Sequence, residues 1–216
     1  MLTIWGRATS SNVQKVLWVC DEIGVRFERI DAGGSFGRTS EPAYRRMNPN
    51  GLVPTLEDDG FILWESNTIC RYLANKHQAT SLYPGCVALE DVRQRAEIEK
   101  WMDWANSHVG PALGPAFHGL VRTPADERDP QAILGSAEKT CAAMQILDQQ
   151  LATRPYVAGD HLTLADIPLG IHAYRWLHLP WKDVGYERPQ MRYLETWYER
   201  LTQRAPYRMW VTVPIS

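Results

Sequence analysis

Along the first eighty residues, short β-prone runs alternate with segments whose hydrophobic residues recur every three or four positions. Residues 2–5 form a β-prone run, and residues 13–23 then place hydrophobic side chains at the spacing of one helix face. Gly24 follows, which suits a helix that ends in a left-handed residue. Residues 26–30 alternate with a period of two and predict a second strand.

The remainder of this region predicts a short helix, a β-hairpin and a third helix. Residues 41–47 have a helical pattern, and two hydrophobic runs at 52–56 and 61–64 flank an Asp-Gly turn. Ser66 follows as a candidate cap of the third helix. The resulting order, β-α-β-α-β-β-α, is an α/β thioredoxin-like plan in which parallel and antiparallel strands share one small sheet.

Strand signals stop after Lys76, and every later periodic segment is helical. We therefore predict a thioredoxin-like domain at residues 1–79, a turn-rich linker at 80–86 and an all-helical domain at 87–216. The helices expected in the second domain are residues 87–109, ending at Gly110-Pro111, and then 131–153, 164–177 and 190–202.

Composition narrows the class of protein. The 23 basic and 25 acidic residues nearly balance, which argues against nucleic acid as a partner. No run of about 18 hydrophobic residues is present, so we expect no membrane span. The four cysteines are scattered and no histidine stands at metal-ligand spacing, so we expect no metal site. Because no leader-like segment precedes the first strand, we expect a cytoplasmic protein.

Three local patterns resemble motifs of the cytosolic glutathione transferase superfamily, in the right order along the chain. Asn48–Leu56 resembles its NPxxxVPxL segment, and Glu65-Ser66 resembles its glutamyl-binding pair. Thr163–Asp166 resembles its helix-capping box, in which we expect Thr163 and Asp166 to act structurally. The resemblance implies a homodimer that binds glutathione as co-substrate, and a small hydrophobic electrophile in the helical domain.

The segment after the first strand is where this family keeps the partner of the glutathione thiol. Ser10 matches the hydroxyl of serine-type transferases, and Asn12 matches the asparagine of bacterial classes that use a threonine–asparagine pair. Ser11 remains a third candidate. Hydroxyl and amide donors at a helix N-terminus can lower the pKa of a bound thiol. Ordinary helix capping is the alternative interpretation for all three residues.

Two further patterns suggest how the tripeptide would be held. A cis peptide bond between Val53 and Pro54 would turn the backbone N–H and C=O groups of Val53 outward, to pair with the cysteinyl unit. Ser66 and the following amide, at a helix N-terminus, suit the γ-glutamyl carboxylate, and Glu65 suits its ammonium group. An edge-strand proline and a capping serine are the simpler alternatives.

The sequence departs from the family pattern at Leu52, where many relatives carry a basic residue for the glycyl carboxylate. Arg38, Arg45 or Arg46 could substitute, and no spacing rule selects among them. Glu99 lies where relatives place an acidic residue that reaches the glutathione of the neighbouring subunit, although a solvated helix face explains it equally well.

The sequence gives the least information about the residues that form the electrophile pocket. The candidates, chosen because they should face Ser10 from the helical domain, are Trp104, Ala105, His108, Pro111 and Trp176. The leading functional hypothesis is glutathione conjugation. The alternatives are a glutathione-dependent peroxidase or disulfide reductase, an isomerase, and a non-catalytic ligand-binding or scaffold protein.

Overall fold

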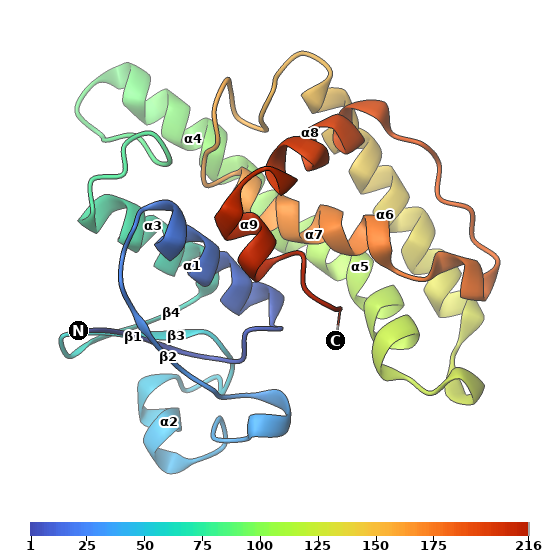
Figure 1. Cartoon of the computed structure of the whole chain (residues 1–216), viewed down its shortest axis with the longest axis horizontal. Helices are drawn as coiled ribbons and strands as arrows, with labels where there is room; N and C mark the ends of the chain where they lie inside the picture. The colour runs from blue at the N-terminus through green and yellow to red at the C-terminus, as the bar shows by residue number, and fades with distance from the viewer. Residues whose placement is uncertain (216) are drawn as a thin grey trace.

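The computed structural model describes residues 1–215, as a four-stranded mixed sheet with helices on both faces followed by a helical bundle (Figure 1). The strands are β1 (Leu2–Trp5), β2 (Glu28–Ile30), β3 (Thr55–Asp58) and β4 (Phe61–Trp64), in the spatial order β2-β1-β3-β4. β1 pairs parallel with β2 and antiparallel with β3, which forms a hairpin with β4. Helices α1 (Ser11–Glu22) and α3 (Ser66–Lys76) cover the face toward the bundle, and α2 (Pro42–Met47) lies on the other side. The predicted thioredoxin-like order is confirmed.

Two element boundaries differ from the sequence prediction. β3 begins at Thr55 rather than Leu52, because Pro54 has no N–H for the ladder and the chain before it leaves the sheet. Ser66 is the first residue of α3 rather than its cap, and Glu65 occupies the N-cap position. Gly24 does adopt the left-handed conformation that was expected after α1, with φ of 67°.

The bundle contains six helices among the described residues: α4 (Leu89–Trp104), α5 (Gly110–Phe117), α6 (Pro130–Leu151), α7 (Asp166–His178), α8 (Arg192–Thr202) and α9 (Ala205–Trp210). The predicted end at Gly110-Pro111 is wrong. The helical path runs on to Arg122 through two π-helical turns, η2 (Ala105–Val109) and η3 (His118–Arg122). In η2 the Gly110 N–H donates to the Ala105 carbonyl five residues back, and this wider turn accommodates the proline that follows.

A side chain from α6 supports this proline-rich path. Pro115 lies inside α5, where it cannot donate a helical hydrogen bond. Close to it, the buried Ser136 hydroxyl donates to the Ala112 carbonyl and accepts from the Ala116 N–H at 3.0 Å. Ser136 therefore stands between two backbone groups that would otherwise bond to each other, and it widens the helix beside the second π-helical turn.

One continuous hydrophobic core joins the sheet layer to the bundle. The Trp18 ring of α1 packs edge-on against Tyr207 of α9, with ring centroids 4.8 Å apart. Arg204 adds two hydrogen bonds of 2.7 and 2.6 Å to the Glu22 carboxylate. Residues 77–88 connect α3 to α4, and the boundaries 1–79, 80–86 and 87–216 stay a prediction. Within residues 1–215, no helix is both long and hydrophobic enough to cross a bilayer.

Candidate functional site

Two cavities share a wall at the N-terminus of α1. The first, of about 430 Å³, lies between this N-terminus, the path from η2 to η3, and α7; we call it the helix cavity. The second, of about 390 Å³, lies between the same N-terminus and the chain before β3 and α3; we call it the loop cavity. The residues that line both are Arg7, Ser10, Asn12, Glu65, Ser66, His118 and Arg122.

Ser10 lies on this shared wall as the residue before α1. Its backbone carbonyl accepts the Gln14 N–H at 2.8 Å, but its hydroxyl caps no helix amide and has no other partner among the described residues. Asn12 also lines both cavities, and its Oδ1 accepts a 3.4 Å hydrogen bond from the Ser66 hydroxyl. Ser11 lines the helix cavity alone. The capping interpretation of Ser10 therefore fails, and its hydroxyl remains available to a ligand.

Gly6 allows the two walls of the loop cavity to approach each other. Its φ is 155°, and a Cβ atom there would lie 2.4 Å from Cγ2 of Val13 and 3.2 Å from Cβ of Val53. Because a Cβ contact of 2.4 Å essentially never occurs, and one of 3.2 Å is tighter than usual, glycine lets α1 and the Val53 segment pack this closely around residue 6. The packing fixes the separation between Ser10 and Val53 across the cavity.

The Val53-Pro54 peptide bond is cis, as expected from the sequence. Val53 and Pro54 line the loop cavity, and neither the N–H nor the C=O of Val53 has a partner within residues 1–215. The preceding Leu52 carbonyl is held firmly, by the Tyr44 hydroxyl at 2.7 Å and by the Asn48 amide at 2.9 Å. The backbone of Val53 is thus presented from a rigid loop.

Glu65 has a backbone conformation that non-glycine residues rarely adopt, with φ of 74°. Its carboxylate has no ion pair or hydrogen bond among the described residues and lines both cavities. Ser66 next to it is buried at the first turn of α3, where backbone N–H groups lack helical partners. The exposed Glu65 carboxylate, which can bind a cation, therefore lies next to the backbone N–H groups at the start of α3, which can bind an anion.

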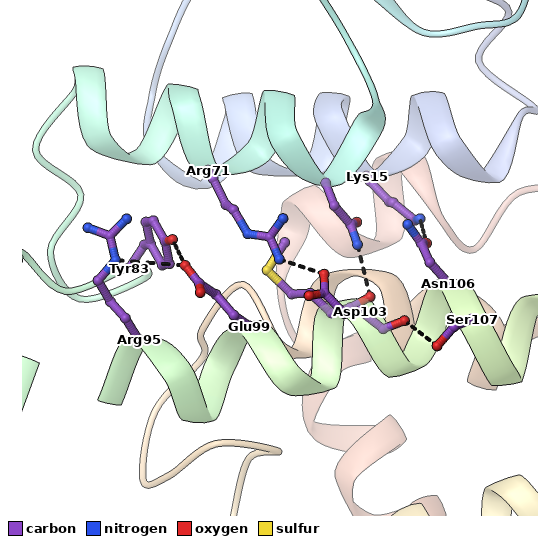
Figure 2. Close-up of polar contacts among 10 residues, drawn as sticks. Lys15, Arg71, Tyr83, Arg95, Glu99, Asp103, Asn106 and Ser107 are labelled. Atoms are coloured by element: carbon purple, nitrogen blue, oxygen red, sulfur yellow. Dashed lines mark hydrogen bonds and ion pairs between the residues drawn. The ribbon is translucent and has the colours of Figure 1, made fainter. Parts of the chain in front are cut away.

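Lys15 is a buried cation that was missed in the sequence analysis. Its ammonium group donates to Asn106 Oδ1 at 2.9 Å, a contact drawn in Figure 2, and to the Ser66 hydroxyl at 3.4 Å. Burial lowers its pKa to about 8; Cys70 and Glu65 oppose this shift, and Arg175 adds to it. The available signal was its spacing, because Lys15 stands one helical turn after Ser11 and so shares its face of α1.

The candidates for the glycyl carboxylate are not brought to the cavities. Arg38, Arg45 and Arg46 are exposed and line neither cavity, and Arg45 donates instead to the Pro49 carbonyl at 2.7 Å. Leu52 lines the loop cavity, but its side chain is apolar and 66% exposed. The polar side chains at that end of the cavity are Asn48 and Asn50.

Glu99 is engaged within its own chain. It accepts a hydrogen bond from the Tyr83 hydroxyl and lies 3.9 Å from Arg95, whose guanidinium stacks on the Tyr83 ring (Figure 2). These contacts join the chain before α4 to the helix itself. Glu99 lines neither cavity, so its expected role toward a neighbouring subunit stays a prediction.

The residues expected around the electrophile lie elsewhere, with the exception of Pro111, which does line the helix cavity. Ala105 is buried, Trp104 packs edge-on against Trp101, and the exposed His108 contacts the Ser107 hydroxyl at 2.8 Å. Trp176 is fully buried against Trp181. The helical residues that do line the cavity on this side begin at Asn106, within η2, and continue into α5 and η3.

The actual wall of the helix cavity combines hydrophobic and cationic side chains. Its hydrophobic part comes from α5, with Pro111, Leu113 and Phe117. Arg7, Arg122 and Arg175 supply positive charge, and His118 and His172 are also present. Burial lowers the pKa of His172, and Lys15 and Arg175 lower it further. No sequence motif marks these residues, because they come from three distant segments.

The residues 1–215 contain no group of three or more His, Cys, Asp or Glu side chains that could hold a metal ion. A thioredoxin-like sheet, an attached helical bundle, and cavities at the N-terminus of α1 that residues of both parts line define a two-part fold. Residues 1–75 match the family "Glutathione S-transferase, N-terminal domain", and residues 109–205 match "Glutathione S-transferase, C-terminal domain".

Individual relatives agree over most or all of the chain. Glutathione S-transferase GstB of Escherichia coli strain K12 is 40% identical, covering 100% of both chains. A theta class glutathione S-transferase of Xanthomonas axonopodis pv. citri, solved with glutathione bound, is 41% identical with a TM-score of 0.91, covering 100% of this chain and 99% of that one. Glutathione S-transferase 3 of Zea mays is 31% identical over 76% of this chain and 73% of its own. The chain belongs to the glutathione S-transferase family.

Proposed function

We propose that this protein is a glutathione transferase, which binds glutathione in the loop cavity and directs its sulfur, as thiolate, at a small electrophile in the helix cavity. The backbone of Val53 pairs with the cysteinyl unit. Glu65 receives the glutamyl ammonium group, and Ser66 with its neighbouring amide receives the glutamyl carboxylate. The supporting observation is the Ser10 hydroxyl, which has no internal partner and stands on the wall that both cavities share.

The energy required is within reach of these donors. A thiol with a pKa of about 8.5 is only a few per cent ionised at neutral pH. Lowering that pKa by about two units needs roughly 2.7 kcal/mol of preferential binding to the thiolate. A hydrogen bond from Ser10 or Asn12 to an anion contributes about 1.5–3 kcal/mol, and the partial positive charge at the start of α1 adds to it.

The first prediction concerns the ionisation of bound glutathione. Ser10→Ala should raise the pKa of the bound thiol by about one unit, and Ser10→Ala with Asn12→Ala by about two, because each change removes a donor to the sulfur. The thiolate absorbance of the glutathione complex, titrated with pH, measures this directly. Turnover of an aryl halide below neutral pH should fall in parallel.

Thr68→Ala is the matched control, because Thr68 is an exposed hydroxyl on the first turns of α3 that lines neither cavity. An unchanged titration in the double variant, with glutathione still bound, would show that the sulfur is activated elsewhere.

A homodimer remains part of the proposal: Val87, Leu89 and Val92, at and just before the start of α4, are exposed hydrophobic side chains suited to a subunit contact. Light scattering tests it.

A further inference from the structure

The helix cavity carries more positive charge than a pocket for a neutral, hydrophobic electrophile needs. Four cationic side chains line it, from Arg7, Lys15, Arg122 and Arg175, whereas Glu65 is its single carboxylate among the described residues. Lys15 is buried, Arg7 and Arg175 are half-buried, and Arg122 is exposed at the edge. Such a concentration of like charge creates a positive potential inside a concave, partly dehydrated space.

Three of these cations form no ion pair among the described residues. Within residues 1–215, the guanidinium groups of Arg7, Arg122 and Arg175 form no salt bridge and donate no hydrogen bond, whereas Arg204 pairs with Glu22 through Nε and Nη2. Arg175 and Arg122 instead lie over the Phe117 ring, at 4.2 and 4.9 Å from its centroid. The ring holds the two arginines in place without neutralising them.

The groups also act on one another. Burial, together with the nearby charges of Arg122 and Arg7, lowers the pKa of Arg175 to about 10. Burial and the Arg122 charge likewise lower the pKa of Arg7. The like charges of the three guanidinium groups repel one another. An anion bound between these groups would relieve that repulsion.

Glutathione in the loop cavity does not account for all of this charge. Arg7 and Arg122 line both cavities and are within reach of either ligand. Arg175, from α7, lines only the helix cavity, together with the hydrophobic side chains of Pro111, Leu113 and Phe117. A second ligand with an apolar body and an acidic group matches this combination of hydrophobic and cationic walls.

We propose that the electrophile of this enzyme carries a carboxylate or a similar acidic group, which Arg175 and Arg122 bind while the apolar body packs on α5. This rests on the proposed transferase function and specifies its substrate class. In an aromatic case the thiolate sulfur bonds to the ring carbon that bears a halogen, the carbon–halogen bond breaks, and the halide leaves. The thiol proton passes to solvent when glutathione binds, so atoms and charge balance.

A matched pair of electrophiles tests the proposal: 4-fluoro-3-nitrobenzoate and its methyl ester, which differ in the acidic group. Each kcat/KM is divided by the rate constant of the uncatalysed reaction with glutathione, because the ester is intrinsically more reactive. The wild-type enzyme should favour the acid by about tenfold or more, as expected for a hydrogen-bonded charge pair. Arg175→Met should reduce that preference about tenfold with the KM for glutathione little changed, because Arg175 lines the helix cavity alone, and Arg122→Met should also reduce the preference.

Arg93→Met is the control, because it removes one exposed arginine of α4 that lines neither cavity. Should neither electrophile react, calorimetry with the two synthetic glutathione conjugates gives the same comparison, and the acidic conjugate should bind about tenfold more tightly. Equal use of acid and ester, or equal binding of both conjugates, would overturn the charge proposal and leave the transferase function intact. Failure to bind glutathione at all would overturn both.

Discussion

At the scale of single residues, the site depends on polar groups that the fold leaves without internal partners. The Ser10 hydroxyl, the Glu65 carboxylate and the Arg175 guanidinium all face a cavity without an ion pair or hydrogen bond in the described chain. Lys15 differs, because its buried ammonium touches only neutral oxygens, from Ser66 and Asn106. Lys15 is the costliest of these groups to keep in place, because its charge is buried without an ion pair, and such groups are typical of a binding site.

The second prediction concerns Lys15 and the pH dependence of stability. Its pKa falls from 10.5 in the unfolded chain to about 8 in the folded one, chiefly through burial. Between these values the unfolded chain binds more protons, so this residue makes stability rise with pH across that window. Lys15→Met should raise the free energy of unfolding by about 1–3 kcal/mol near neutral pH, with a smaller gain at about pH 10.

Urea unfolding of both proteins at the two pH values measures this effect. The comparison isolates Lys15, because the neighbouring charges of Glu65 and Arg175 are present in both chains. A gain of the same size at both pH values would contradict the assignment of a lowered pKa to Lys15.

At the scale of elements, two π-helical turns decide which side chains reach the helix cavity. η2 contributes Asn106 and is followed by Gly110 and Pro111, and η3 contributes His118 and Arg122. Each π-helical turn contains one residue more than an α-helical turn. The side chains that follow it therefore point in different directions from those of an uninterrupted α-helix. The same mechanism that accommodates the prolines therefore aims Arg122 at the cavity.

Helix α7 carries Arg175 in its last turn, and a buried carboxylate, that of Asp166, holds the first turn of this helix in place. Asp166 accepts hydrogen bonds from the Val157 N–H at 3.0 Å, the Thr163 N–H at 2.9 Å and Trp197 Nε1 at 2.9 Å. Thr163 and Asp166 each accept from a backbone N–H as expected, the Thr163 hydroxyl from Ala165 at 3.3 Å, but Ala165 rather than Thr163 is the N-cap of α7. The Asp166 contacts also reach the loop before α7 and α8. Burial raises the pKa of Asp166 to about 6, and these hydrogen bonds act in the opposite direction.

The third prediction is that Asp166→Asn lowers the free energy of unfolding by about 2–4 kcal/mol near pH 7. The amide would turn an NH₂ group toward N–H donors that now have an acceptor, leaving buried donors unpaired. Because the raised pKa of Asp166 removes stability as pH increases through about 6, the wild-type advantage should be smallest above that value. Urea unfolding measures it, with the exposed Asp160→Asn as the control. Equal effects of the two changes would refute a special role for Asp166.

At the scale of the whole molecule, the two parts of the chain share a single core, and the site lies where they meet. Gly170 of α7 permits the close approach: a Cβ atom there would lie 2.9 Å from Leu201 and 3.1 Å from the Trp18 ring. Its carbonyl also accepts the Tyr207 hydroxyl at 2.8 Å. α1 is thereby fixed against the bundle, and with it Ser10 against the helix cavity.

The fourth prediction is that Gly170→Ala destabilises the whole protein by about 1–3 kcal/mol, because the added methyl group overpacks the contact between α1 and the bundle. Gly135→Ala is the control: it lies within α6 with nothing within 4 Å of the added atom, and alanine there should stabilise by up to about 1 kcal/mol. Tryptophan fluorescence and far-ultraviolet circular dichroism should follow one coincident transition in both variants. Separate transitions would show that the two parts unfold independently.

The sequence by itself determined the element order and the position of Ser10 before α1, because hydrophobic periodicity and turn residues act over a few positions. The cis Val53-Pro54 bond was expected from the resemblance to the family motif. Tertiary structure alone decided which bundle residues face Ser10. Trp104 and His108 do not line the helix cavity, whereas Arg122, which follows the two π-helical turns, does. Arg7, Arg122 and Arg175 are far apart in the chain, and only the packing of α7 and η3 against the start of α1 makes them one cationic wall.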